Sequence, residues 1–429
     1  MRALAVLLPV AAAAVASAQT APSVLSRGLL PRPGPTVEQS LFRPFIGLTY
    51  GYDEGPLTRD LERGDGPFQE INGGLAALRS GERGEFRLDY RFAARYYSRH
   101  RSLDRTNHGL HLDARARLSR RVSLLLRNTG SSSSFGEPLE AAPEAVSSGF
   151  FIDGGPVVFH SRTLANTALA DLVVALSART SISVGGDGFL VQHQHRGFAD
   201  ALGWRARADF AHRYARHKTV TLSYSFTHFD HTRAFGGADY DVWAAGHSLR
   251  LGRRSELDLL AGVGRLRTAG LRAVELDRDI ARILGSPLGV EIFRLRTWTP
   301  HILAAWTRGV GRGAVRAQYS RVVTDGGGLT GVARQNVLSA GVGSPVGRSW
   351  RIAAIAVGRS YRSLDSLLYD AAIASAGGEA ARRLGAHLEL VWRYRYSLHH
   401  FQRGLLRQFG RHEASAGIQF APAAWNRLD

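Results

Sequence analysis

Residues 86–97 read FRLDYRFAARYY and carry the clearest structural pattern in the chain. Its even positions are hydrophobic throughout, whereas its odd positions carry three arginines and one aspartate. A period of two places the hydrophobic side chains on one face of a β-strand and the charged side chains on the other. Because a tilted strand needs about 9–11 residues to cross a bilayer, the stretch predicts a membrane-spanning strand.

The same alternation recurs along the chain, for example in residues 110–118, 204–213, 219–227 and 387–396. Short breaks that contain Arg or Lys interrupt it, and longer connections rich in Gly, Asp and Ser lie between them. The breaks are residues 80–84, 119–121, 178–180, 217–218, 252–254, 311–313, 347–349 and 382–384. Tight turns that alternate with long loops are typical of a transmembrane antiparallel up-and-down β-barrel.

Counting from these turns predicts nine hairpins, and therefore about 18 strands, with 16 as the alternative. The predicted strands are 41–52, 69–79, 84–97, 107–118, 121–130, 161–177, 180–192, 200–215, 218–229, 239–251, 255–268, 292–310, 313–323, 331–346, 350–361, 370–380, 385–397 and 413–421. Segment 370–380 is the weakest, and it is included because single-chain bacterial barrels have an even number of strands.

The ends of the chain predict export. Residues 1–18 combine a basic start, an apolar stretch and the small residues Ala16-Ser17-Ala18, which is the pattern of a secretory signal peptide. Residues 19–40 contain four prolines and predict an unstructured periplasmic lead. The barrel then covers 41–421, and 422–429 form a C-terminal tail.

The composition of the chain limits the kinds of partner that it can bind. The chain has no cysteine, which excludes disulfides and thiolate chemistry, and a net charge of +19 from 55 basic and 36 acidic residues. Such a charge in a cytosolic protein suggests nucleic acid, but the signal peptide and the even spread of the arginines argue against that partner. The charge instead predicts a basic cavity with an anionic partner.

The candidate site is a set of arginines at the parity opposite to the hydrophobic side chains, which is the lumen face of the predicted barrel. Guanidinium groups stay charged and bind carboxylate, sulfate or phosphate, and rings of arginine bias a pore toward anions. The alternative is that these arginines pair with acids on neighbouring strands and stiffen the wall. The predicted anion-binding residues are Arg87, Arg91, Arg95, Arg115, Arg117, Arg205, Arg207, Arg213, Arg294, Arg296, Arg316, Arg393 and Arg395, with Arg127 at the same parity.

Two long connections carry further predictions. Segment 131–160 is the longest and contains Glu137, Glu140, Glu144 and Asp153, which would form a constriction if the loop folds into the lumen. A surface loop is the alternative. Segment 269–291 includes an amphipathic stretch at 275–284, which predicts a turn or two of helix.

Catalytic signals are weak. His193-Gln194-His195 places two imidazoles on one side of a strand, but no acid is close in sequence. Serine, histidine and aspartate form no distinguishing local motif. The sequence therefore predicts no enzyme, cofactor or metal, with an outer-membrane hydrolase as the less favoured alternative.

The signal peptide, the alternation, the basic turns and the last strand around 416–420 together resemble bacterial outer-membrane β-barrels of the porin and alginate-type exopolysaccharide-exporter class. The resemblance implies a place in the outer membrane of a Gram-negative-type bacterium, with contacts to outer-membrane lipid and the barrel-assembly machinery. It also implies passage of anionic small solutes or acidic polysaccharide. A structural or assembly-associated barrel with a closed lumen is the alternative. Such barrels mostly end on an aromatic residue, whereas here nine residues follow Phe420.

Overall fold

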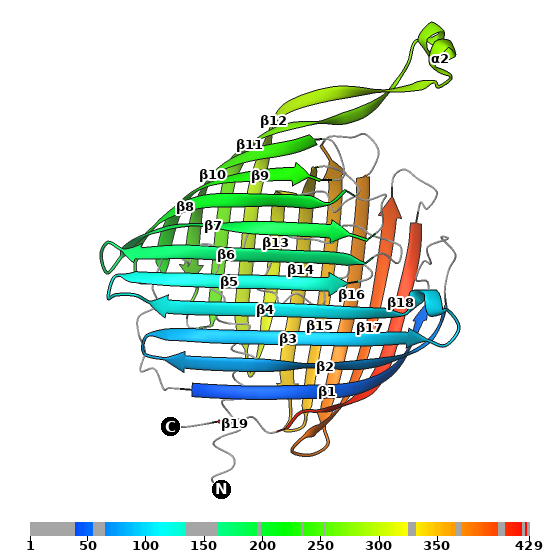
Figure 1. Cartoon of the computed structure of the whole chain (residues 1–429). Helices are drawn as coiled ribbons and strands as arrows, with labels where there is room; N and C mark the ends of the chain where they lie inside the picture. Colours follow the sequence, from blue (N-terminus) through cyan, green and yellow to red (C-terminus); the bar gives the residue numbers. More distant parts are fainter. Residues whose placement is uncertain are drawn as a thin grey trace.

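The computed structural model describes residues 39–54, 65–133, 162–194, 199–232, 236–252, 254–324, 332–364, 370–401, 408–422 and 425–426. The predicted signal peptide and nearly all of the predicted lead lie outside these residues. The described residues form one large antiparallel sheet that curves into a barrel (Figure 1). Its strands are β1 (Gln39–Glu54), β2 (Gly66–Gly81), β3 (Gly84–Tyr97), β4 (Arg105–Arg117), β5 (Val122–Ser133), β6 (Thr163–Ala175), β7 (Thr180–His193), β8 (Ala201–Ala215), β9 (Lys218–His231), β10 (Gly236–Arg250), β11 (Ser255–Glu275), β12 (Leu288–Val310), β13 (Gly313–Thr324), β14 (Ala333–Val346), β15 (Trp350–Ser363), β16 (Asp370–Arg383), β17 (Leu388–Phe401), β18 (Gln408–Phe420) and the short β19 (Trp425–Asn426).

The sheet closes on itself. Each strand from β2 to β17 pairs with its neighbours in sequence, and β1 pairs with both β2 and β18. The closing register runs from Ile46 opposite Phe420 to Glu54 opposite His412. The two residues of β19 extend this seam by pairing with Leu41 and Phe42. The prediction of an 18-stranded up-and-down barrel is therefore confirmed, and the doubtful segment 370–380 is part of β16.

The predicted basic turns are all at one end of the barrel, between β2 and β3, β4 and β5, and so on around the wall. Gly311 and Gly347 have φ values of 59° and 64° there, a conformation that glycine adopts without steric cost. In outer-membrane barrels the short turns face the periplasm and the long connections face outward. We therefore call the two ends of this barrel the periplasmic and extracellular ends.

One predicted loop is shorter than expected. Instead of a connection over 269–291, β11 and β12 continue as a two-stranded hairpin up to the pair Glu275 and Leu288. This hairpin projects beyond the barrel (Figure 1). It ends in the helix α2 (Arg278–Leu284), which Asp277 caps by accepting a hydrogen bond from the backbone N–H of Asp279. The predicted helix is confirmed. The predicted ends of the two strands were wrong, because β11 and β12 continue to pair with each other beyond the last residues that pair with β10 and β13.

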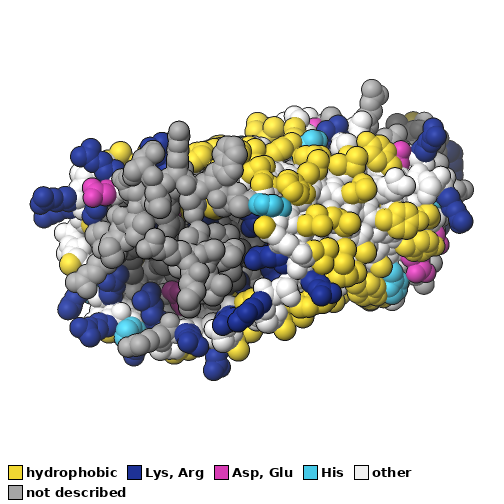
Figure 2. All heavy atoms as spheres, turned by 90° about the horizontal axis from the view of Figure 1, so that it is seen from below, with side chains coloured by type: hydrophobic (Ala, Val, Ile, Leu, Met, Phe, Trp, Pro, Cys, Tyr) yellow, Lys and Arg dark blue, Asp and Glu magenta, His cyan; other side chains and the backbone are white. Residues whose placement is uncertain are grey.

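The two faces of the wall differ in chemistry. Hydrophobic side chains such as Ile46, Leu48 and Leu338 point outward and are 55–61% exposed, whereas the buried polar side chains lie mostly on the inner face. Figure 2 shows a broad hydrophobic area on one side of the molecule, with arginine and lysine side chains toward both ends. A closed barrel that is apolar outside and polar inside satisfies its backbone internally and suits a bilayer. The chain is accordingly an outer-membrane β-barrel.

Among the described residues, no helix is both long enough and apolar enough to cross a membrane.

Candidate functional site

The strand register shows which arginines face the lumen, because side chains of directly paired residues point to the same side of a sheet. All but two of the predicted lumen arginines share the inner face around the whole barrel. They are Arg87, Arg91, Arg95, Arg115, Arg117, Arg127, Arg205, Arg207, Arg213, Arg316, Arg393 and Arg395.

Arg294 and Arg296 are the exceptions, and their predicted lumen position is wrong. Arg296 lies opposite Arg267 and shares its face with Trp298, which is 63% exposed, whereas Thr299 on the other face is buried. These positions belong to the hairpin beyond Ile302, where β13 no longer pairs with β12. Outside the bilayer the rule that apolar side chains face outward no longer applies.

A cluster of charged side chains crosses the closing seam at the extracellular end. Arg95 donates hydrogen bonds to Glu70 at 2.8 Å and to Glu413 at 2.7 Å, and its Nη1 lies 3.6 Å from Asp53. Arg411 donates two further bonds to Asp53, at 2.8 and 2.7 Å. We call Asp53, Glu70, Arg95, Arg411 and Glu413 the seam cluster. It links β1, β2, β3 and β18, and all its members are at least largely buried.

Other buried lumen arginines are paired in the same way. Arg205 donates to Asp187 at 2.9 and 2.7 Å, and Arg207 binds Asp171 on β6 through two nitrogens. On β5, Arg127 donates to Asp113 at 2.6 Å. For these buried side chains the structure matches the alternative in which arginines and acids of neighbouring strands brace the wall.

A second group of lumen arginines is exposed to solvent. The side chains of Arg91, Arg351 and Arg393 are 44–49% exposed although they lie on the inner face. Ile355, also on the inner face, is 51% exposed. The lumen along these strands is therefore accessible to water.

We call the inner face of the periplasmic half of β15–β17, β1, β3 and β4 the basic arc. Arginines outnumber carboxylates on it: Arg43, Arg87, Arg91, Arg115, Arg117, Arg351, Arg383 and Arg393 lie among Glu85, Asp89, Asp113, Glu379 and Glu389.

Partial pairing is typical of the basic arc. Arg393 donates to Glu379 at 2.9 Å, and Arg351 lies 3.5 Å from Glu379 and 3.6 Å from Glu389. Arg43 is within electrostatic range of Glu389, Arg351 and Arg383. The sequence-based prediction counted Arg383 with the basic turn 382–384, and it did not include Arg43 and Arg351 among the lumen arginines.

The wall across the lumen is apolar and aromatic near the extracellular end. Phe189, Phe229, Tyr240 and Leu266 lie on the inner face of β7 and β9–β11 and belong to one buried hydrophobic cluster. The rings of Phe189 and Phe229 are 5.6 Å apart. This cluster lies across the lumen from the basic arc, and the charged side chains nearest to it, such as Arg205 and Asp187, are paired with each other.

The remaining sequence-based candidates are only partly covered by the structure. Glu137, Glu140, Glu144 and Asp153 lie outside the described residues, so the constriction loop remains a prediction. His193 is buried, and its backbone N–H donates to Asp200 at 2.7 Å. Within the described residues no group of three potential metal-binding side chains is present.

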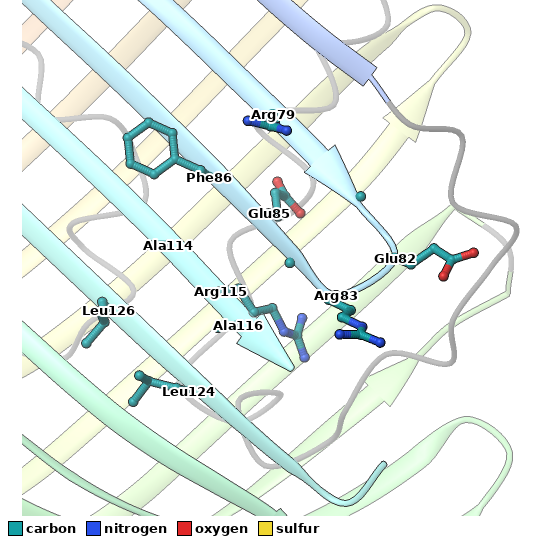
Figure 3. A pocket seen from close by; sticks show the side chains of 12 residues that line it. Arg79, Glu82, Arg83, Glu85, Phe86, Ala114, Arg115, Ala116, Leu124 and Leu126 are labelled. Carbon is teal, nitrogen blue, oxygen red and sulfur yellow. The ribbon is translucent and has the colours of Figure 1, made fainter. Parts of the chain in front are cut away.

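A groove of about 570 Å³ lies at the periplasmic turn between β2 and β3 (Figure 3). Its apolar part consists of Phe86, Leu124 and Leu126, which point outward. Arg79 and Arg83 line its edge. The groove is therefore mostly on the outer wall, although Glu85 and Arg115 of the inner face also line it.

No family model and no curated protein matches the chain. Solved structures align over most of its length at low identity. OpdQ of Pseudomonas aeruginosa aligns with a TM-score of 0.42 at 10% identity, over 90% of this chain and 98% of its own. OccK2 (OpdF) of the same organism, solved in complex with glucuronate, has a TM-score of 0.41 at 13% identity, over 89% and 98%. OccAB4 of Acinetobacter baumannii has a TM-score of 0.42 at 9% identity, over 92% and 100%.

Proposed function

We propose that this protein is an outer-membrane channel that passes anionic solutes through its lumen. The observation that carries the proposal is the basic arc, in which eight arginines, five of them exposed to solvent, lie among five carboxylates. A guanidinium group stays charged in a confined lumen, and its forked donors fit carboxylate and phosphate oxygens. Excess positive charge along a water-filled wall raises the local concentration of anions and lowers that of cations.

The buried arginines have a different role in this proposal. Arg95, Arg205 and Arg207 donate hydrogen bonds to carboxylates of other strands and stabilise the wall. Exposed arginines such as Arg351 and Arg393 share their acids with one another, which leaves donors free for a passing anion. Because these arginines also interact with the carboxylates of the wall, they bind the solute weakly enough for it to leave, as conduction requires.

Small carboxylates or phosphates are the solute class that we favour, and acidic polysaccharide is the second candidate. The basic arc extends over six strands, so a chain of repeated carboxylates could contact several arginines in succession. Blockade of the channel by an oligouronate, but not by a neutral oligosaccharide of the same length, would support the polysaccharide.

Reversal potential in planar bilayers under a salt gradient tests the proposal. We expect anion selectivity for the wild-type protein and a clear loss of it after Arg117→Gln, Arg351→Gln and Arg383→Gln are combined. Arg265→Gln with Arg267→Gln and Arg296→Gln is the matched control, because these three arginines lie on the outer face and their replacement should leave the reversal potential unchanged. Cation selectivity, an absence of conductance steps, or an equal effect of the control variant would refute the proposal.

A further inference from the structure

Three arginines lie side by side on the outer face at the extracellular ends of β13, β14 and β15. Arg334 is the direct register partner of Arg362. Arg321 pairs with Asn336, which stands two residues after Arg334 on the same face. Neighbours of this kind are about 4.5–8 Å apart, so the long side chains can reach a common point. We call Arg321, Arg334 and Arg362 the arginine triad.

The triad points away from the lumen. Leu338 and Val342 share the parity of Arg334 and are 61% and 47% exposed. Gln335 and Val337, at the other parity, are 1% and 4% exposed and face inward. The guanidinium groups therefore lie on the lipid side of the wall, above an apolar surface.

The charge of the triad is poorly compensated. The carboxylate of Asp370 is 3.8 Å from Arg362 Nε, and it is the only one within ion-pair distance of the triad in the part of the chain that the structure describes. The Nε atoms of Arg321 and Arg334 are buried and have no hydrogen-bond partner among the described residues. Like charges placed directly opposite in a sheet repel, and buried donors without acceptors are costly. Both costs disappear if an anion binds between the side chains.

Outward arginines elsewhere on the same barrel are arranged differently. Arg265 and Arg267 on β11 also point away from the lumen, but Arg265 donates to Asp241 at 3.0 Å. Arg267 lies 3.4 Å from Asp241 and 3.8 Å from Asp239. The Nε atom of Arg267 also lacks a hydrogen-bond partner, but two carboxylates lie within ion-pair distance of these two arginines, whereas the three arginines of the triad have only Asp370 among the described residues.

Polar side chains mark the level of the triad relative to the membrane. Directly below it, Tyr319 donates a hydrogen bond to Asn336 at 3.4 Å, and Asn336 donates to Ser360 at 3.0 Å. A tyrosine with polar neighbours on the outward face is typical of the membrane interface. Arginine on a lipid-facing wall is tolerated near the interface far better than at the midplane. The triad is therefore at the height of the headgroups of the outer leaflet.

We propose that the arginine triad binds a phosphate of a phosphorylated lipid headgroup in the outer leaflet. Three forked guanidinium groups match the oxygens of a phosphate, which would also accept the hydrogen bonds that the two Nε atoms lack. The acyl chains of such a lipid would lie over the apolar surface around Leu338 and Val342. The site lies on the outer wall and does not depend on the lumen.

Lipid binding to the purified, folded protein tests this site. The probes are diphosphoryl lipid A and its dephosphorylated form in detergent micelles, with bound lipid counted by native mass spectrometry. We expect the wild-type protein to retain the phosphorylated lipid and to bind it at least tenfold more tightly than the dephosphorylated form. Arg334→Gln with Arg362→Gln should weaken this binding at least tenfold.

The control pair here is Arg265→Gln with Arg267→Gln, which removes the same charge from the same face. If this control still retains lipid A, the binding is specific to the triad. If both pairs of substitutions weaken lipid A binding equally, the lipid is held only by the general positive charge of the rim, and the proposal is overturned. Competition by inorganic phosphate alone at the affinity of the lipid would assign the site to a free anion, also against the proposal. The heat-modifiable mobility of the barrel on gels shows that each variant is folded. The reversal potential, measured in parallel, reports on the lumen independently.

Discussion

Replacing Asp53 with alanine should destabilise the barrel more than replacing most other single acids. Asp53 is fully buried, and it accepts two hydrogen bonds from Arg411 and one of 2.6 Å from the hydroxyl of Tyr97. It also lies 3.6 Å from Arg95. Without it, Arg411 and the buried hydroxyl of Tyr97 lose a hydrogen-bond acceptor at the closing seam, and Arg95 loses one of its ion-pair partners.

The expected cost follows from these contacts. Hydrogen bonds to charged groups contribute about 1.5–3 kcal/mol each, and removing one member of a buried ion pair costs about 3–5 kcal/mol. Arg411 keeps a second acceptor, because Glu413 remains 3.3 Å away. We therefore expect a loss of about 3 kcal/mol for Asp53→Ala, near the lower end of the range.

Urea titration of the protein folded in phospholipid vesicles, followed by tryptophan fluorescence, measures this loss. The matched control is Glu85→Ala, which removes an acid that is 45% exposed and lies 3.3 Å from Arg87. Exposed pairs contribute at most about 1 kcal/mol. If the loss of stability comes from a buried arginine left without its carboxylate, the double change Asp53→Ala and Arg411→Ala should lower the free energy of unfolding by less than the sum of the two single changes. Equal losses for Asp53→Ala and Glu85→Ala would refute the reasoning.

Two further predictions test the faces of the wall. Leu338→Arg places a charge on the lipid side in the middle of β14 and should lower the free energy of unfolding by about 2–4 kcal/mol, whereas the side chain of Ser339→Arg enters the lumen and should be tolerated. The same urea titration in vesicles compares the two variants. A larger loss for Ser339→Arg would mean that the two faces have been assigned the wrong way round. Gly264→Ala puts its Cβ into the ring of Tyr240 in the lumen and should cost about 1–3 kcal/mol, whereas Gly343→Ala meets no atom within 4 Å. Equal urea midpoints for the two alanine variants would show that Tyr240 moves aside freely.

Much of the wall was predictable from local pattern. In lipid, a strand must alternate apolar and polar side chains over its whole length, and this constraint is visible within a stretch such as 86–97. Turns with short basic sequences then set the strand count, including the weak segment that became β16 (Asp370–Arg383). The rule failed at Arg294 and Arg296 because their hairpin leaves the wall, and lipid no longer imposes the alternation there.

The division of the arginines into structural and exposed groups was not predictable in this way. Arg91 and Arg95 stand at equivalent parity in the same strand, yet Arg95 is buried against three acids and Arg91 is 49% exposed. The partners come from strands that only the closure of the barrel brings close together: Arg95 and Glu413 are separated by 318 positions, and Asp53 and Arg411 by 358.

The amino-acid pattern alone was therefore sufficient for the barrel, its strand number and the faces of most strands, because alternation and turns are local properties that the bilayer imposes strand by strand. Only the tertiary structure decided which arginines are neutralised, which remain exposed in the lumen and which converge on the outer rim. These outcomes depend on the register between strands and on the closure of β1 against β18, and no short stretch of sequence contains that information.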